Sequence, residues 1–539
     1  MKRLLLILIT VLLCVCAASA DDDAHHHDDM APEQLGTVNF PTSCVIQVQG
    51  QFERGVALLH SFWYEEAEKQ FDQIVQEDPH CAMAHWGVAM SLWHQLWNHP
   101  DRKTIKKGLA EVKAAEKLHS TDDRERGYIS AIAAFYGGSR RRTYRDRAVA
   151  YSKVMETNYE HHPEDREGAA FYALSLLASA PDNDTTFANQ KKAGAILEKL
   201  FAEEPNHPGV AHYIIHSYDS PQLAELGLPA ARAYAKIAPA APHALHMPSH
   251  IFARLGLWQD DIDSNLASIA ATRKTAAMHM GGASHQFHAM DFLEYAYLQS
   301  GREVEAQHLI DEVKAMPEMK DNMYGSDFDP RAYSLVVFSA RYDLELHHWS
   351  DAASLPLVPG ADPGDNAITY WARAIGAARS GNPSEARTSI AEIQSIHKML
   401  VKRKNAESAA YVDIDRKEAE AWLAYAEGNR DQAQKTLRAV AEKQEAEGDE
   451  PLAVPAREML ADMLVEMNQP AQALTEYESD LKFNPNRFDG LYGAAHAAEL
   501  AGKNTEANTY YAQLLKVCSG ASSDRLELSK AKALLAKDN

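Results

Sequence analysis

A set of small, aromatic and proline residues recurs along the chain at fixed spacing. In its first occurrence Gly55, Ala67, Phe71 and Pro79 follow one another at steps of 12, 4 and 8 residues. Later occurrences keep two or three of these positions; they are Ala193, Leu197 and Pro205; Ala230, Tyr234 and Pro242; Gly381, Ala386 and Ile390; Gly428, Ala433 and Leu437; Ala473, Tyr477 and Pro485; and Gly502, Ala507 and Tyr511. A chain that repeats one pattern over most of its length is built from copies of one small unit that stack on one another.

These residue types are the ones that a pair of packed helices requires. A glycine or alanine lets two helices touch, an aromatic side chain fills the contact with the next pair, and a proline ends the second helix because it has no N–H to donate. Strand signals are absent, whereas segments rich in glycine, proline and asparagine separate the repeats. The pattern therefore predicts an all-α chain of about eleven or twelve helix pairs.

The repeated unit resembles that of the tetratricopeptide repeat (TPR) family, in which helix hairpins of about 34 residues stack into a solenoid. The resemblance implies a right-handed superhelix with a concave groove that binds a protein or peptide partner. The expected organisation is a signal peptide over 1–20, a disordered acidic and histidine-rich tail with a lead-in segment over 21–47, N-terminal TPR-like hairpins over 48–205, histidine-rich central hairpins over 206–315 and C-terminal hairpins over 316–539.

The N-terminus has the pattern of a secretory signal. A charged start, Met1-Lys2-Arg3, precedes a mostly apolar run over 4–15 and a small-residue site over 18–20. This order is typical of a cleaved signal peptide, and the run is too short for a typical membrane span. A retained membrane anchor is the alternative. We expect a secreted or periplasmic mature chain, beginning near residue 21, with no stable membrane span.

The chain is strongly acidic. Its formal net charge is −22 at pH 7, and cleavage of a leader that contains Lys2 and Arg3 would lower it to −24. A surface of this sign repels the phosphates of nucleic acids and anionic lipids, and it suits cations, cationic peptides or neutral ligands. We therefore expect no nucleic-acid partner. The three adjacent histidines over 25–27, which lie among aspartates, either bind metal weakly or belong to a solvating tail.

Few cysteines are present, so stability must come mainly from packed apolar surface. Removal of the leader leaves Cys44, Cys81 and Cys518, which do not make a disulfide framework. In an oxidising compartment this set is compatible with one bridge, between Cys44 and Cys81. The sequence does not decide whether that bridge forms.

Histidine is concentrated in one segment. Nine of the chain's 25 histidines lie between His207 and Asp291. They are His207, His212, His216, His243, His246, His250, His279, His285 and His288. The interval from His212 to His246 is 34 residues, and so is the interval from His216 to His250. Because this interval equals the TPR period, each pair is expected at equivalent positions of neighbouring units.

The repeat frame places these histidines on three successive helices. Gly256 and Gly301 fit the turn between the two helices of their units. The first helices of the three units then carry, in chain order, His212 and His216; His243, His246 and His250; and His288, Asp291 and Tyr295. The family resemblance implies that these positions face the concave groove.

Such a ladder of imidazoles can bind metal. Two histidines four residues apart on a helix have Cβ atoms about 5–6 Å apart and can share one ion at about 2.0–2.1 Å per bond. Imidazole with a carboxylate suits zinc, copper, iron or nickel. The predicted ligands are His212, His216, His243, His246, His250, His288 and Asp291. The alternative is that these histidines only hydrogen-bond a peptide or a neighbouring helix.

Pro248 complicates one of the pairs. A proline inside a helix removes a hydrogen bond and clashes with the preceding turn, so a helix is expected to begin at Pro248. His246 would then lie in the entering loop, and it would lose the four-residue geometry with His250. No helix breaker separates His212 from His216, so that pair is the better placed.

Together these features predict an exported TPR scaffold whose groove binds a protein or peptide and a transition metal. Trp86 and Trp93 form an aromatic stripe that either packs in the core or extends the groove, and Tyr295 is a further groove residue. A metal-dependent enzyme, oxidative or hydrolytic, and a metal buffer or carrier are the alternatives. No catalytic residue is identified, because Tyr213 stands where a zinc-protease helix would carry glutamate.

Overall fold

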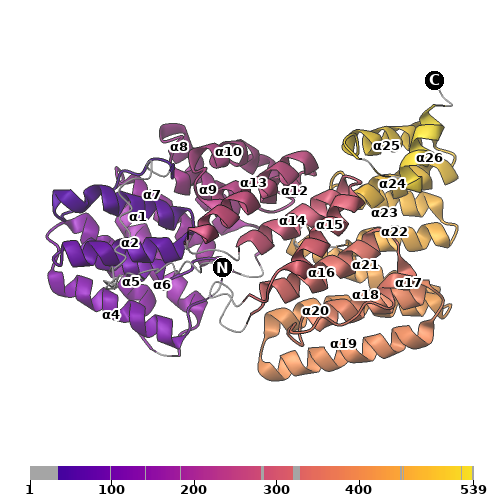
Figure 1. The fold of residues 1–539 in the computed structure, drawn as a ribbon, viewed down its shortest axis with the longest axis horizontal. Helices are drawn as coiled ribbons and strands as arrows, with labels where there is room; N and C mark the ends of the chain where they lie inside the picture. The colour runs from indigo at the N-terminus through magenta and orange to yellow at the C-terminus, as the bar shows by residue number, and fades with distance from the viewer. Residues whose placement is uncertain are drawn as a thin grey trace, which may run out of the picture. The chain divides into compact units, whose positions relative to one another are not determined.

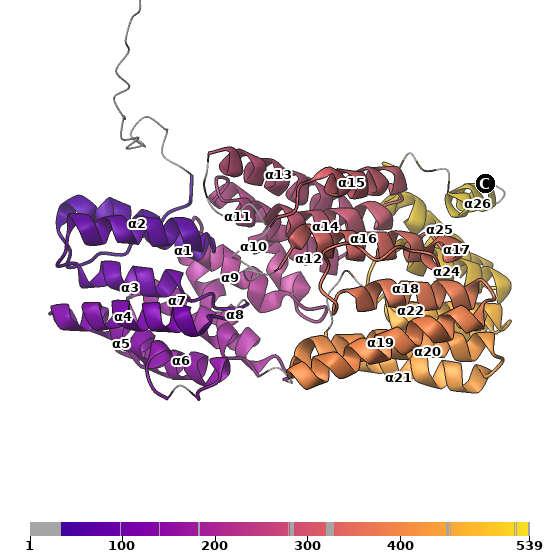
Figure 2. The same cartoon turned by 60° about the horizontal axis from the view of Figure 1, so that its bottom comes forward.

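The computed structural model describes residues 34–539 except 98, 140, 182–183, 279, 281–284, 320–327, 449–451, 453, 522, 524 and 537–539. Over these residues the chain is helical and has no strand, so the all-α prediction is confirmed. Figures 1 and 2 show the helices following one another in stacked pairs, from indigo α1 to yellow α26. None of the described helices is both long and apolar enough to cross a lipid bilayer.

The helices form consecutive pairs. They are η1 (Ile46–Val48), α1 (Gln49–His60), α2 (Tyr64–Glu77), α3 (Ala82–Ser91), α4 (Arg102–Leu118), α5 (Asp123–Tyr136), α6 (Tyr144–His161), α7 (Arg166–Ala178), α8 (Ala188–Glu203), α9 (Pro208–Tyr218), α10 (Ala224–Ile237), α11 (Pro242–His246), α12 (Pro248–Arg254), α13 (Trp258–Ala277), α14 (His285–Gln299), α15 (Glu303–Ala315), α16 (Pro330–Glu345), α17 (Trp349–Ala352), α18 (Asn366–Arg379), α19 (Pro383–Arg403), α20 (Ala406–Ala426), α21 (Arg430–Glu447), α22 (Ala456–Glu466), α23 (Pro470–Asp480), α24 (Phe488–Leu500), α25 (Asn504–Val517) and α26 (Leu526–Leu535). With α11 and α12 counted as one interrupted helix, α1 to α25 make twelve pairs. The architecture is a TPR-like α-solenoid.

The first hairpin shows why the repeat pattern produces this packing. The ring of Phe71 on α2 lies against Gly55 on α1 and Gly87 on α3, and a Cβ atom at either glycine would collide with it. The two glycines therefore let one aromatic ring fill the contact between successive hairpins. This is the role that the sequence pattern assigns to Gly55 and Phe71.

Several hairpin turns use a glycine in the left-handed conformation. Gly256, Gly301, Gly381, Gly428 and Gly502 have φ between 62° and 86°, and each follows a first helix. At the turn between α1 and α2 this position is Phe62, with φ of 53° and the same pair of backbone hydrogen bonds to the preceding helix. A bulky residue in this conformation costs about 1–2 kcal/mol.

Replacement of Phe62 by glycine is expected to give a protein about 1 kcal/mol more stable than replacement by alanine. Both substitutions remove the same buried ring, but only alanine keeps a Cβ atom in the left-handed conformation. Urea unfolding of the two variants, followed by circular dichroism, measures the difference. Equal stability of the two variants would contradict the strain at Phe62.

The first helices of the N-terminal hairpins surround a filled core. Helix α1 contacts both α3 and α9, so the fifth hairpin returns to the first (Figure 1). Trp86 on α3 is fully buried, with its ring centroid 5.5 Å from those of Tyr128 on α5 and Phe171 on α7. Trp93 is also fully buried and stacks on Phe135 at 4.1 Å. The prediction that Trp86 and Trp93 line a partner groove is therefore wrong, because their own neighbouring helices cover them.

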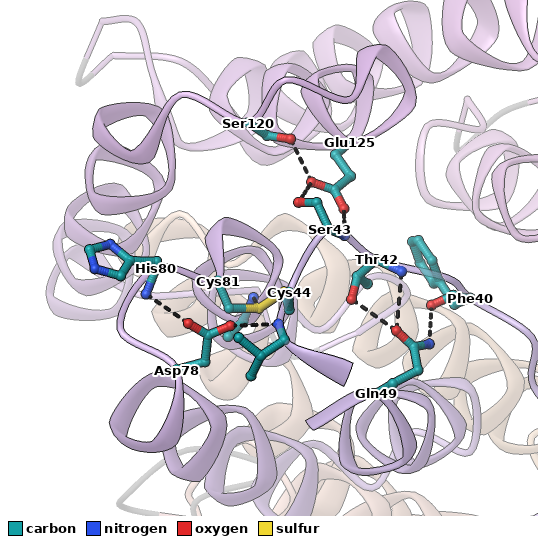
Figure 3. Close-up of a disulfide and its surroundings, with 12 residues drawn as sticks. Phe40, Thr42, Ser43, Cys44, Gln49, Asp78, His80, Cys81, Ser120 and Glu125 are labelled. Carbon is teal, nitrogen blue, oxygen red and sulfur yellow. Dashed lines mark hydrogen bonds between the residues drawn. A yellow bond between two sulfur atoms is a disulfide. The ribbon is translucent and has the colours of Figure 1, made fainter. Parts of the chain in front are cut away.

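A segment before α1 ties these hairpins together. Thr37 donates its backbone N–H to the carbonyl of Asn206 at 2.9 Å, so the chain is ordered well before α1. Cys44 and Cys81 form a disulfide that joins this segment to the start of α3 (Figure 3). Beside it the backbone N–H of Val45 donates to Asp78 Oδ2 at 2.9 Å. The lead-in segment is therefore part of the folded unit from Gln34 onward.

Buried charges join the central hairpins to the C-terminal ones. Arg487, which precedes α24, is fully buried and lies 2.9 Å from Glu345 Oε1 on α16. It also donates to both carboxylate oxygens of Glu458 on α22, at 2.8 and 3.0 Å. Helix α24 contacts α14 here, so segments about 190 residues apart pack together.

Candidate metal centre

The structure gathers six of the seven predicted ligands into two neighbouring groups. Triad A consists of His212 and His216 on α9 and His243 on α11, and triad B consists of His246 at the end of α11, His250 on α12 and His288 on α14. Within each triad the imidazoles offer one nitrogen each, and these three atoms lie within 4.8 Å of one another. Each triad joins two histidines of one hairpin to one of the next, so the equivalent residues His212 and His246 lie in different triads.

The distances between nitrogens suit one ion per triad. In triad A the Nε2 atom of His212 lies 3.0 Å from that of His216 and 3.1 Å from that of His243. In triad B the Nε2 atoms of His246 and His250 are 3.1 Å apart. Nitrogen ligands bonded tetrahedrally to one ion at about 2.0–2.1 Å lie about 3.3 Å from each other. Only small adjustments would therefore close either triad around a metal ion.

Pro248 breaks the helix as expected, with α11 ending at His246 and α12 beginning at Pro248. The predicted loss of the pair is wrong, however. Met247 keeps right-handed helical angles of φ −52° and ψ −33°, and its N–H still donates to the His243 carbonyl at 2.9 Å. The chain therefore keeps its helical course through the break, and His246 and His250 face each other.

Hydrogen bonds at Nδ1 orient two rings of triad B. His250 donates from Nδ1 to Asp219 Oδ2 at 2.8 Å, and His246 donates from Nδ1 to Asn265 Oδ1 at 2.7 Å. The orientation of the Asn265 amide is set because its Nδ2 donates to Asp261. When both imidazoles are neutral, each carries its one N–H at Nδ1, and both Nε2 atoms then present lone pairs. Two lone pairs that face each other at 3.1 Å repel unless a cation lies between them.

Triad A is anchored differently. His212 donates from Nδ1 to the backbone carbonyl of His60 at 2.6 Å. The Nδ1 atom of His243 is buried and has no hydrogen-bond partner among the described residues. No carboxylate contacts the described nitrogens of this triad in the way that Asp219 contacts His250.

Burial keeps these imidazoles neutral. It lowers the pKa of His212, His243 and His246 well below 6.5, and the charges of nearby imidazoles lower each pKa further. Burial and the charge of His250 lower the pKa of His216 and of His288 to about 3. At neutral pH these five side chains therefore offer lone pairs, as metal coordination requires.

The two triads lie side by side. The ring centroids of His243 and His246 are 6.2 Å apart, and those of His216 and His250 are 6.5 Å apart. His212 is fully buried, whereas His216, His250 and His288 are half-buried. Both triads therefore have a buried side and a side nearer solvent.

Two predicted site residues are held elsewhere by arginines. Asp291 Oδ1 accepts a hydrogen bond from Arg341 at 2.8 Å and belongs to neither triad. Tyr295 is buried, and its hydroxyl accepts a hydrogen bond from Arg487 at 2.5 Å. Asp291 is thus not placed as a ligand, and Tyr295 does not line an open groove.

Two residues that orient the triads were not predicted. Asp219 directly follows the end of α9 and contacts His250 of the next hairpin, so its spacing from His216 does not mark it. Asn265 comes from α13, nineteen residues beyond His246, and no local pattern marks it.

The remaining histidines of the segment have other places. His207 Nε2 donates to Glu167 Oε1 at 3.0 Å, and His60 Nε2 donates to the other oxygen at 2.8 Å. Burial alone would raise the pKa of Glu167, but His207 and His60 lower it. Burial alone would lower the pKa of His207, but Glu167 raises it. Both oxygens of the buried Glu167 therefore have hydrogen-bond partners within the fold. His285 lies 5.4 Å from the His243 ring, outside both triads, and His279 lies outside the described residues.

Asp261, behind Asn265, supplies a pH-dependent contribution to stability. It is fully buried, and its Oδ2 atom has no hydrogen-bond partner among the described residues. Burial raises the pKa of Asp261 well above its usual value. The folded carboxyl thus keeps its proton at a pH where the unfolded one, with a pKa of about 3.9, has lost it.

The wild-type protein is therefore expected to lose stability relative to Asp261→Asn as the pH rises above about 4, by at most about 1.4 kcal/mol per pH unit. The amide of the variant has no proton to release, so this contribution is absent from it. Urea unfolding of both proteins at several pH values measures the difference. Parallel pH profiles would show that the folded pKa of Asp261 is not raised.

Comparison with known proteins gives matches of architecture alone. No protein family and no curated protein matches the sequence. Among solved structures, a human IFIT1 dimer with PPP-AAAA shares 12% identity over 81% of this chain and 90% of that chain, with a TM-score of 0.35. The complex of Naa15 and Naa10 bound to HypK-THB shares 11% identity over 90% of each chain, with a TM-score of 0.23. A solved TPR domain shares 14% identity over 70% of this chain and 99% of its own, with a TM-score of 0.20. Likenesses this low carry no argument about ligands or activity.

Proposed function

We propose that the protein binds two transition-metal ions, one in each histidine triad, within its TPR-like solenoid. The contact between His246 and His250 carries this proposal. Their Nε2 atoms are 3.1 Å apart while both Nδ1 atoms donate to Asn265 and Asp219. A cation between the two nitrogens removes the repulsion of their lone pairs, and the third imidazole, His288, completes a three-nitrogen site.

The ligand set selects a class of metal. Six imidazoles and no carboxylate form the two triads. Imidazole nitrogens suit zinc, copper, iron and nickel, whereas magnesium, calcium and manganese prefer oxygen ligands. Three protein ligands leave a fourth position of a tetrahedral ion open to water or substrate. The half-buried His216, His250 and His288 lie on the side where such a ligand would exchange.

The test is metal content. A protein with His25, His26 and His27 replaced by alanine, which removes the tail histidines, is expected to bind two equivalents of Zn²⁺ or Cu²⁺ after reconstitution. The double variant His216→Ala/His250→Ala takes one ligand from each triad and is expected to lose both ions while staying helical. His161→Ala/His308→Ala, which removes two exposed histidines, should retain both ions. If the reconstituted protein contains no more than trace amounts of metal, the proposal is refuted.

The open position makes an enzyme the second candidate. A metal-dependent oxidative or hydrolytic activity would disappear on chelation and on loss of either triad. A metal carrier would instead exchange its ions and show no turnover. A peptide-binding scaffold is the third reading, and it predicts a partner that stays bound after chelation. Trp86, Trp93 and Tyr295 were predicted to contact the peptide, but all three are buried, which weakens the scaffold hypothesis.

Export remains part of the proposal. The disulfide between Cys44 and Cys81 supports an oxidising compartment, since such bonds are rare in reducing cytosol. The sequence pattern over 1–20 supports the same location. Sequencing the N-terminus of the mature protein tests it, with a start near residue 21 expected.

A further inference from the structure

We propose that the two metal positions are unequal: triad B binds a divalent ion more tightly and fills first, whereas triad A is suited to an ion of lower charge. This inference rests on the proposed function, because it concerns the same six histidines. It goes further by assigning each triad an order of filling and a charge preference. The difference lies in what surrounds the ligands.

Triad B has an anion in direct contact with a ligand. Asp219 accepts from His250 Nδ1 at 2.8 Å through Oδ2, and its Oδ1 accepts from Arg254 Nε at 2.9 Å. The arginine fixes the carboxylate in place. A carboxylate that accepts the second N–H of a ligating histidine makes that imidazole a stronger donor, and losing such a partner costs about 10- to 100-fold in metal affinity. His246 is oriented in the same way by the neutral Asn265.

Triad A lies among aromatic rings instead. The Phe62 ring centroid is 4.3 Å from that of His212, 5.6 Å from that of His216 and 5.7 Å from that of His243. Tyr234 stacks on His212 at 5.2 Å. The only described anchor of His212 is an uncharged carbonyl, and Nδ1 of His243 has no partner among the described residues.

The backbone of Phe62 is independent support for a role of the aromatic rings around triad A. This backbone occupies a turn position with φ of 53°, where Gly256 and Gly301 stand in later hairpins. Glycine would avoid the strain at that position. The chain instead carries a ring that contacts all three members of triad A.

The Glu167 carboxylate does not contact a ligand of triad A in the way that Asp219 contacts His250 of triad B. Among the described residues, the Glu167 carboxylate hydrogen-bonds only His60 and His207, and His60 contacts triad A through its backbone carbonyl. His207 Nε2 and His60 Nε2 each donate to one oxygen of Glu167, so this carboxylate is occupied by imidazoles outside triad A. No anion therefore contacts a described nitrogen of triad A.

The charge of the metal ion decides how strongly it prefers one triad over the other. The free-energy cost of burying an ion rises with the square of its charge, so a divalent ion suffers more than a monovalent one from apolar surroundings. Triad B offsets this cost through the direct contact of Asp219 with His250, whereas the charge of Asp219 acts on triad A only at a distance, through His216. A divalent ion should prefer triad B by about tenfold or more, and this preference should shrink for Cu⁺.

Two variants isolate the triads. His216→Ala leaves triad B intact, and His288→Ala leaves triad A intact; both should bind one ion. In competition with a chromogenic chelator, His216→Ala is expected to hold Zn²⁺ at least tenfold more tightly than His288→Ala. With Cu⁺ under reducing conditions, the ratio of the two affinities should fall below half of its Zn²⁺ value.

Asp219→Asn in each background identifies the cause. Combined with His216→Ala it should weaken Zn²⁺ binding by 10- to 100-fold, and combined with His288→Ala by less than fivefold. Circular dichroism checks that each protein is folded. Equal Zn²⁺ affinities of the two triads, or equal effects of Asp219→Asn on both, would overturn the inference while leaving two-ion binding intact. Failure of both single-triad variants and of the parent protein to bind any ion would instead refute the proposed function.

Discussion

Replacing Arg487 by alanine is expected to lower the free energy of unfolding by about 3–5 kcal/mol. Arg487 is fully buried and pairs with Glu345 at 2.9 Å and with Glu458 at 2.8 Å. Without the guanidinium both carboxylates would stay buried without their cation. They would have to take up protons or draw water into the interior, and either change destabilises the folded chain.

Because Arg487 joins the central and C-terminal hairpins, its loss should destabilise those hairpins more than the N-terminal ones. Arg487 also donates to the hydroxyl of Tyr295, so its loss removes contacts among α14, α16 and α22 at once. Urea unfolding measures the effect, and hydrogen exchange should show faster opening of α14 and α24 than of α1. Arg273→Ala, which breaks an exposed pair with Glu312, is the matched control and should change stability by less than about 1 kcal/mol. Similar losses in both variants would contradict the structural role of Arg487.

Removing the disulfide is expected to cost about 4 kcal/mol. The bond joins Cys44 to Cys81 across a sequence separation of 37 residues, and restricting a loop of that length lowers the entropy of the unfolded chain. It also holds the lead-in segment, whose Phe40 ring packs against Trp86. The double variant Cys44→Ser/Cys81→Ser tests this by urea unfolding under non-reducing conditions.

Serine is the appropriate replacement, because Cys81 also caps α3 by accepting a hydrogen bond from the backbone N–H of Ala84. Serine can keep that cap. Treatment of the wild-type protein with a reductant should destabilise it by a similar amount and leave the double variant unchanged. If reductant destabilises both proteins equally, the effect does not come from this disulfide.

Local packing explains how much of the fold the sequence predicts. Gly55 and Phe71 mark contacts within and between adjacent hairpins, so their spacing predicts the α-helical repeat. The positive φ of Gly256 and Gly301 confirms that both glycines form turns, which places the histidines on the expected helices. Each of these features depends only on near neighbours in the chain.

Contacts between distant segments explain what was missed. Trp86 is buried against Phe40, 46 residues earlier, and Phe171, 85 residues later, and Tyr295 is buried because Arg487 reaches it across 192 residues. Asp291 is held by Arg341, fifty residues later. The repeat pattern describes one hairpin and its neighbour and contains no information about where a solenoid closes on itself.

Two bound ions are the central claim, and anomalous X-ray scattering from crystals of the zinc-loaded protein tests it most directly. The expected result is two peaks, one in each triad, each about 2.0–2.1 Å from three imidazole nitrogens. The first should lie among His212, His216 and His243, and the second among His246, His250 and His288. Zinc found only at other residues, or triads that keep direct contacts between their nitrogens with no peak, would contradict the account.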